Sequence, residues 1–139
     1  MVTIAYQIAV SYLRRASGSL YPALFVELQN LSNPAKSIQI AAELDSGAEY
    51  SLFEGKLAIA IGLDLFGGKP FAFELNNGVA LDARILPVAI SHDDLGRLNL
   101  DARFSTGPLR RNILGRDFFD LLQVGFDEHH SEVYLSLRQ

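Results

Sequence analysis

Short runs in which apolar and polar residues alternate, separated by turn residues, make up most of this 139-residue chain. Alternation with a period of two residues is typical of strands that bury one face. It predicts strands at 4–13, 21–29, 38–44, 70–91 (in two arms), 97–105, 124–127 and 132–137. Only 51–63 and 115–122 have the character of short helices. This pattern predicts a mainly β, barrel-like fold in which residues 1–139 form a single domain.

Two local signals predict where a helix and a hairpin begin and end. Ser51 and Glu54 stand at the spacing of a capping box, so the first helix is expected to begin at Ser51. Gly62 suits the C-terminal end of that helix. The tripeptide Asn76-Asn77-Gly78 separates two alternating arms within 70–91 and favours a tight hairpin turn. On these residues alone, 70–91 is an ordinary hairpin.

The composition argues against several classes of function. The formal net charge is −4 and no basic stripe is present, so we expect no nucleic-acid partner. Without cysteines the chain has no disulfide, thiol chemistry or cysteine zinc site. Neither an export signal nor an apolar run of membrane-spanning length is visible, which predicts a cytoplasmic protein without a membrane partner. His129 and His130 would point to opposite faces of a strand, so we expect no metal and no cofactor.

A single carboxylate stands at the end of an apolar run, in Leu44-Asp45-Ser46-Gly47-Ala48. The run at 38–44 reads as a half-buried strand, and Asp45 is lifted from it into a turn. Gly47 lets another backbone approach this turn closely. A protein can display a catalytic acid in this way. Because Asp, Ser and Gly are common turn residues, a plain strand-to-loop turn is the other interpretation.

A second segment, 113–119, reads Ile-Leu-Gly-Arg-Asp-Phe-Phe. In this order, the two segments resemble those of the retropepsin-like aspartic proteases, the single-domain, homodimeric relatives of retroviral proteases. That family shows an apolar residue followed by Asp-[Ser/Thr]-Gly-[Ala/Ser], and later two apolar residues followed by Gly-[Arg/Met]-[Asp/Asn]. The resemblance covers about 21–137. It implies a closed β-barrel of the acid protease fold with two short helices, one lobe per chain, and a flap hairpin at about 70–91 that closes over bound peptide.

Peptide hydrolysis needs one group that activates water and another that protonates the carbonyl oxygen and the leaving amine. Two carboxylates held close together can divide these roles, because they share one proton. This chain carries only one Asp-Ser-Gly turn. The simplest dyad is therefore a homodimer that places Asp45 beside its symmetry mate, and the family resemblance implies the same arrangement. The predicted activity is that of an aspartic endopeptidase acting on peptide or protein substrates.

The resemblance also implies roles for the residues around Asp45. Ser46 would hydrogen-bond across the dimer, although a bond to its own turn is the alternative. The Gly47 carbonyl would accept a hydrogen bond from substrate, and the small side chain of Ala48 suits a closely packed base of the active site. Arg116 matches a family arginine that pairs with an acid shortly after the catalytic turn. Glu49 occupies that acidic position here, where retroviral members have aspartate, and the pair would form within the chain or across the dimer.

The remaining candidates come from the predicted hairpin and the second segment. Glu49, Asn77 and Gly78 are expected to bind substrate together with Gly47, and Gly115 is expected to support the catalytic turn with Arg116. The alternative function is a non-catalytic, dimeric peptide-binding or scaffolding module that takes up extended peptides by strand addition. Tight binding of a hydroxyl-bearing transition-state analogue would favour catalysis over that alternative.

Overall fold

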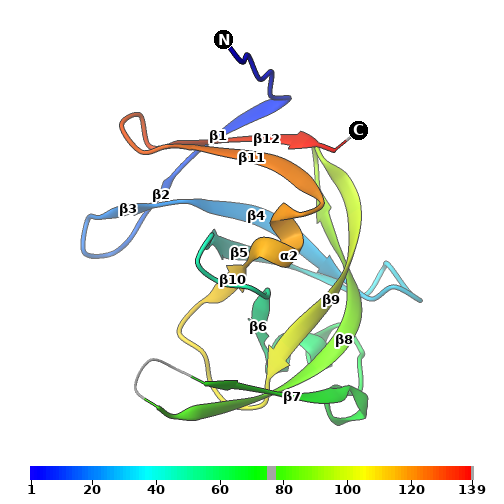
Figure 1. The fold of residues 1–139 in the computed structure, drawn as a ribbon. Helices are drawn as coiled ribbons and strands as arrows, with labels where there is room; N and C mark the ends of the chain where they lie inside the picture. Colours follow the sequence, from blue (N-terminus) through cyan, green and yellow to red (C-terminus); the bar gives the residue numbers. More distant parts are fainter. Residues whose placement is uncertain (75–77, 139) are drawn as a thin grey trace.

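The computed structural model describes residues 1–74 and 78–138 and is mainly β (Figure 1). Two short α-helices and one 3₁₀ turn interrupt the strands: α1 (Gly55–Ala60), α2 (Arg116–Phe119) and η1 (Leu65–Gly67). The strands are β1 (Ile8–Ser11), β2 (Leu13–Arg14), β3 (Leu20–Tyr21), β4 (Ala23–Gln29), β5 (Ser37–Leu44), β6 (Leu52–Glu54), β7 (Lys69–Glu74), β8 (Ala80–His92), β9 (Gly96–Ser105), β10 (Asn112–Leu114), β11 (Leu122–Asp127) and β12 (Glu132–Leu137). The predicted fold class is confirmed.

Most strands belong to one sheet that returns on itself. Its order is β4-β5-β10-β6-β9-β8-β7, and an additional pairing between β4 and β8 joins the sheet into a ring with β7 attached outside. Figure 1 shows this ring below the upper sheet, with β7 along its lower side. The side chains of Leu24, Phe53, Ile90, Phe104 and Leu114 are almost completely buried in the core. Each such side chain contributes about 1.5–3 kcal/mol to folding.

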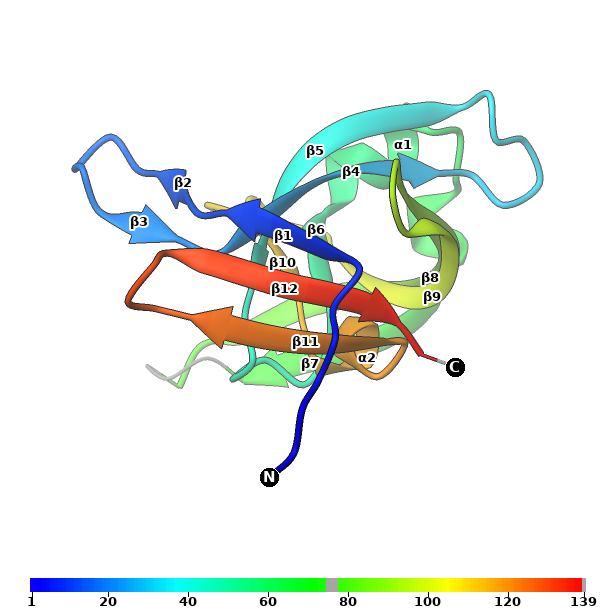
Figure 2. The ribbon, with the colours of Figure 1, turned by 90° about the horizontal axis from the view of Figure 1, so that it is seen from above.

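A smaller sheet, ordered β1-β12-β11, packs against the ring, and its three strands lie side by side in Figure 2. The sequence predicted a single strand at 4–13, but the chain divides it at Tyr12. Residues of β1 pair with β12, whereas β2 pairs with β3. Tyr12 lies between them, buried, and donates a hydrogen bond of 2.7 Å from its hydroxyl to Glu128. Burial, followed by the contact with Glu128, raises the pKa of Tyr12 to about 12, so the hydroxyl keeps its proton.

The expected helix at 51–63 is wrong at its beginning. Leu52 to Glu54 form β6, which pairs with β9, and α1 begins only at Gly55. The Ser51 side chain does not cap a helix, because it is used elsewhere in the fold, and the Glu54 N–H donates to the Asn112 side chain at 3.2 Å. The end is as predicted: Gly62 follows α1 with a φ of +81°, a conformation that favours glycine.

The connection of greatest importance for the site is the insertion of β10 between β5 and β6. β5 and β6 follow each other in sequence, yet β10 pairs with both, parallel to β5 and antiparallel to β6. The loop at 45–51 must therefore pass over the end of β10. At the crossing, a Cβ on Gly115 would lie 2.7 Å from the Ala48 carbonyl oxygen and 2.8 Å from the Tyr50 carbonyl. Glycine is required there because the two backbones are in contact.

The turn between β11 and β12 contains an ion pair that makes it pH-sensitive. His130 Nδ1 lies 2.8 Å from Asp127 Oδ2. Hydrogen bonding to Asp127 raises the pKa of His130 above 6.5, and the same contact lowers the pKa of Asp127. The stabilisation by His130 is complete below pH 6.5 and is lost as the pH rises through its raised pKa. The stabilisation by Asp127 is lost as the pH falls through its lowered pKa.

We therefore expect the ring protons of His130 to titrate above pH 6.5 in an NMR experiment. Asp127→Asn should bring the His130 titration back towards 6.5, because it removes the negative charge. An unchanged His130 titration in Asp127→Asn would contradict the assigned pair.

Among the described residues, no helix is both long enough and apolar enough to cross a membrane.

Candidate active site

The turn that carries Asp45 is held at both ends by backbone hydrogen bonds. The Asp45 N–H donates to the Leu114 carbonyl at 3.0 Å, and the Ala48 N–H donates to the Asp45 carbonyl at 3.2 Å. The Gly47 N–H donates to Asp45 Oδ1 at 2.9 Å, which orients the carboxylate. Asp45 is partly exposed, and Ser46 and Gly47 are exposed. The turn thus presents a fixed carboxylate at the surface.

A buried serine and an aspartate connect the loop after this turn to α2. The Ser51 hydroxyl, with no exposed surface, donates to Asp117 Oδ1 at 2.7 Å and accepts from the Gly115 N–H at 3.0 Å. The Ser51 N–H donates to both Asp117 oxygens, at 2.9 and 3.0 Å. The Phe118 N–H adds a fourth bond to Asp117 at 2.8 Å. Sequence reasoning missed Ser51 and Asp117 as site support, because their partners lie 66 residues apart.

The beginning of α2 holds the same loop through its backbone. The Arg116 N–H donates to the Ala48 carbonyl at 2.8 Å, and the Asp117 N–H donates to the Glu49 carbonyl at 3.2 Å. Together with the close packing at Gly115, these bonds fix residues 48–51 against the second sequence segment. The structure therefore brings the two motifs into direct contact, although they are some seventy residues apart in sequence.

Two side chains predicted to interact do not meet within the single chain. Glu49 and Arg116 are both exposed, and among the described residues they form no ion pair with each other. The Ser46 hydroxyl likewise makes no hydrogen bond to a described residue of this chain, so the alternative of a local turn bond is not seen. Ser46 and Arg116 instead line one groove together with Phe119, Val124 and other residues.

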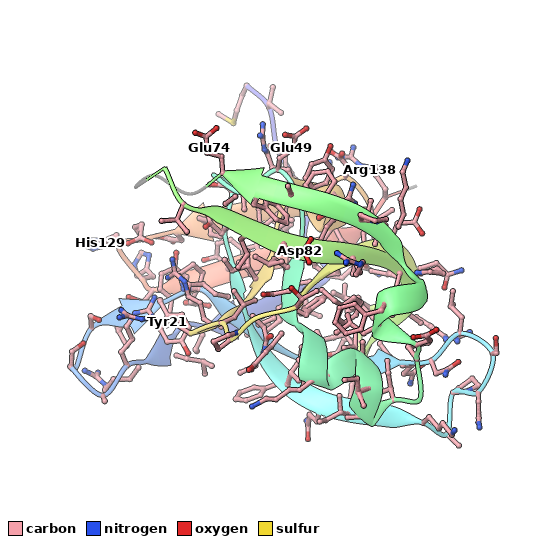
Figure 3. All side chains as sticks on the ribbon, turned by 90° about the horizontal axis from the view of Figure 1, so that it is seen from below. Tyr21, Glu49, Glu74, Asp82, His129 and Arg138 are labelled. Carbon is pink, nitrogen blue, oxygen red and sulfur yellow. The ribbon has the colours of Figure 1, made fainter. Side chains whose placement is uncertain are left out.

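A separate pocket of about 450 Å³ opens beside Asp45. Its walls combine apolar and acidic side chains: Asp45, Ala48, Glu49, Tyr50, Leu52, Phe71, Ala72, Phe73, Glu74 and Ile113. Glu49 and Glu74 both line this pocket, and Figure 3 shows them on the same side of the molecule, Glu74 at the end of β7. A larger hollow between Tyr6 and Arg138 has no acidic side chain among the described residues that line it, so it offers no carboxylate for acid–base chemistry there.

The hairpin predicted at 70–91 is present as β7 and β8, which pair antiparallel from Lys69 opposite Ile85 to Glu74 opposite Ala80. Asn77, one of the predicted substrate-binding residues, lies outside the described residues. Gly78 is exposed and has a φ of +79°, which favours glycine. The hairpin borders the pocket through Phe71, Phe73 and Glu74. Within the described part of the chain, no cluster of three or more His, Asp or Glu side chains could hold a metal ion.

Two solved structures with a similar fold are aspartic proteases. A retropepsin-like aspartic protease from Rickettsia conorii superimposes with a TM-score of 0.61 at 18% identity, covering 97% of this chain and 96% of that one. The EIAV protease in complex with the inhibitor HBY-793 superimposes with a TM-score of 0.53 at 17% identity, covering 72% and 86%. These two superpositions show that the chain has the retropepsin-like fold. Neither a family model nor a curated protein sequence matches the chain.

Proposed function

We propose that this protein is an aspartic endopeptidase and that two chains form one active site, each contributing Asp45. The observation that carries the proposal is the Asp45 turn itself, which is pinned by β10, oriented by Gly47 and open to a pocket. The chain contains one such turn, whereas hydrolysis by carboxylates needs two acids of different protonation state. The likeness to retropepsin-like proteases in fold supports this assignment.

In the proposed reaction the two Asp45 carboxyls share one proton. The ionised member takes a proton from water, whose oxygen forms a bond to the peptide carbonyl carbon. The protonated member gives its proton to the carbonyl oxygen, and a tetrahedral diol results. The member that took the proton from water then gives it to the amide nitrogen, while the other member takes a proton from one diol hydroxyl. The C–N bond breaks, a carboxylic acid and an amine are released, and the dyad again holds one proton. The Gly47 carbonyl would accept a hydrogen bond from the substrate backbone, and the β7–β8 hairpin, with Asn77 and Gly78, would serve as the flap.

The groove beside Ser46 is the proposed surface for the second chain. It includes Ser46, the residue after Asp45, and is also lined by Arg116, Phe119 and Phe126. The Phe126 side chain is 40% exposed there, as is expected of an apolar residue that a partner covers. In this arrangement Ser46 would hydrogen-bond across the dimer, and Arg116 could reach Glu49 across the interface.

Ligand stoichiometry tests this proposal directly. We expect sedimentation to show a dimer and a hydroxyl-bearing peptide analogue of the diol to bind with one molecule per two chains, because both Asp45 side chains contact one ligand. The dimer should cleave an unfolded protein substrate. A chain that stays monomeric at high concentration, or binds one analogue per chain, would contradict the shared site. If the protein binds peptides but neither cleaves them nor binds the analogue, it is a peptide-binding module instead.

A further inference from the structure

Arg103 on β9 contacts aromatic rings from two separate parts of the pocket. Its guanidinium carbon lies 3.7 Å from the ring centroid of Tyr50, which follows the catalytic turn. The same carbon lies 4.9 Å from the ring centroid of Phe71, on β7. The Tyr50 and Phe71 rings meet edge-on at 5.3 Å, and Phe73 continues the row at 4.9 Å from Phe71. One cation thus joins the catalytic loop to the predicted flap strand.

The guanidinium is held mainly by these rings. Its Nη1 donates to the Asp101 carbonyl at 2.9 Å, but its Nε is buried and has no hydrogen-bond partner among the described residues. Arg103 also forms no ion pair within the described part of the chain. Burying an N–H that has no hydrogen-bond partner costs free energy, so the guanidinium of Arg103 needs another favourable contact at this position. The faces of Tyr50 and Phe71 supply it as cation–π contacts.

The backbone of Arg103 is fixed to the support of the catalytic turn. Its N–H donates to the Ser51 carbonyl at 3.1 Å, and Ser51 is the residue bound to Asp117. The guanidinium therefore projects from a strand paired on both sides, whereas Phe71 lies on β7, which among the described residues pairs only with β8. Tyr50, Phe71 and Phe73 all line the pocket beside Asp45. The two rings that Arg103 contacts, Tyr50 and Phe71, therefore form part of the wall of that pocket.

We propose that Arg103 is a positioning residue that fixes β7 to the catalytic loop and so shapes an aromatic wall for a large apolar side chain of the substrate. This inference rests on the proposed peptidase function and adds the determinant of one specificity pocket. Arg103 itself touches neither the reacting carboxylate nor water. Its removal changes substrate binding more than the chemical step, because Asp45 keeps its own contacts.

The test is Arg103→Met, which keeps a long apolar side chain but removes the planar cation. For peptides whose Phe or Leu side chain enters this pocket, we expect KM to rise roughly fivefold to tenfold with kcat nearly unchanged. The preference for Phe or Leu over Ala at the same substrate position should shrink by a similar factor. Arg103→Lys should recover part of the loss, since it restores the charge without the planar face. A fall in kcat and thermal stability with KM and preference unchanged would overturn the positioning role.

Arg15→Met is the matched control. The Arg15 guanidinium carbon lies 4.0 Å from the ring centroid of Tyr21, outside the β7–β8 hairpin, and neither residue lines the pocket. This variant should leave KM and side-chain preference as in the wild type. Phe71→Leu, combined with Arg103→Met, should show strong non-additivity in KM, because both substitutions break the same contact. Additive effects, or an Arg15→Met variant with the same rise in KM, would contradict the proposal.

NMR separates this inference from the peptidase proposal. Ring currents from Tyr50 and Phe71 should shift the Arg103 Hε resonance, and that proton should exchange slowly because its nitrogen is buried. The Tyr50→Leu variant should remove most of the shift. These observations need no activity, so a wild-type protein that fails to cleave peptides would refute the peptidase function alone. Fast exchange and an unshifted Hε would refute the stacking of Arg103.

Discussion

Asp45→Asn should lower kcat for peptide hydrolysis by about 10³-fold or more while leaving the fold and the dimer intact. Asparagine has the same shape as aspartate, and its side-chain oxygen can still accept the hydrogen bond from the Gly47 N–H, which is 2.9 Å long in the wild type. What it lacks is the ability to take up a proton at neutral or acidic pH. The measurement is cleavage of an unfolded protein or peptide library, with sedimentation and circular dichroism on the same sample.

Mixing the two proteins tests whether the site is shared. If subunits exchange freely, an equal mixture of wild type and Asp45→Asn contains about a quarter of dimers with two Asp45 residues. The activity per total protein should then fall to about a quarter of the wild-type value. A fall to about a half would mean that each chain acts alone.

A matched control for the loss of one surface carboxylate is Asp94→Asn, in the turn between β8 and β9. Asp94 is exposed, and its carboxylate makes no hydrogen bond or ion pair to a described residue. This variant should cleave at the wild-type rate. Equal cleavage by Asp45→Asn and the wild type would rule out the assignment of Asp45.

Asp117→Ala should lower the free energy of unfolding by about 3 kcal/mol, which corresponds to a fall in Tm of roughly 10 °C. The Asp117 carboxylate accepts bonds from the Ser51 N–H, the Ser51 hydroxyl and the Phe118 N–H. Alanine leaves the donors of the fully buried Ser51 without a partner, and unpaired buried donors carry most of this cost. Urea unfolding followed by circular dichroism gives the free energy, and the slope of the transition shows whether the comparison is valid.

The comparison variants separate the carboxylate from the rest of the helix. Asp117→Asn keeps an acceptor oxygen in place and should cost only about 1 kcal/mol. Asp120→Ala removes an exposed carboxylate one residue beyond α2 and should change stability by less than about 0.5 kcal/mol. If Asp117→Ala and Asp120→Ala were equally stable, the Ser51–Asp117 contact would not be the support that its geometry indicates.

Alternation in the sequence predicted the strands well because each buries one face. In β4 and β5 the alternating residues Leu24, Val26, Leu28, Ile40, Ala42 and Leu44 are buried, whereas Phe25 and Ala41 on the other face are exposed. The capping-box signal at Ser51 failed because a distant carboxylate, Asp117, took the serine hydroxyl, and tertiary contacts override a weak local preference. The division of 4–13 at Tyr12 depends on two different partner strands, which a local pattern does not reveal.

The residues of the candidate site also fall into two groups, those that the sequence identified and those whose roles only the structure reveals. Asp45, Gly47 and Gly115 were visible because catalytic turns and close backbone crossings demand particular residue types. Ser51, Asp117 and Arg103 were not, since an ordinary serine, aspartate or arginine acquires its role only from the residue that the fold brings opposite it. The Glu49–Arg116 pair, expected from the resemblance, is not formed within one chain.

The insertion of β10 also bears on when the Asp45 turn can form during synthesis. The Asp45 turn takes its backbone support from Leu114, so a growing chain that has not yet reached this residue cannot complete the turn. Pairings between residues as distant as Ala42 and Asn112 are slow to form, because a long loop must close first. The Asp45 turn therefore closes only after the chain as far as Leu114 has been made and β10 has paired with β5, so its formation is a late event in folding.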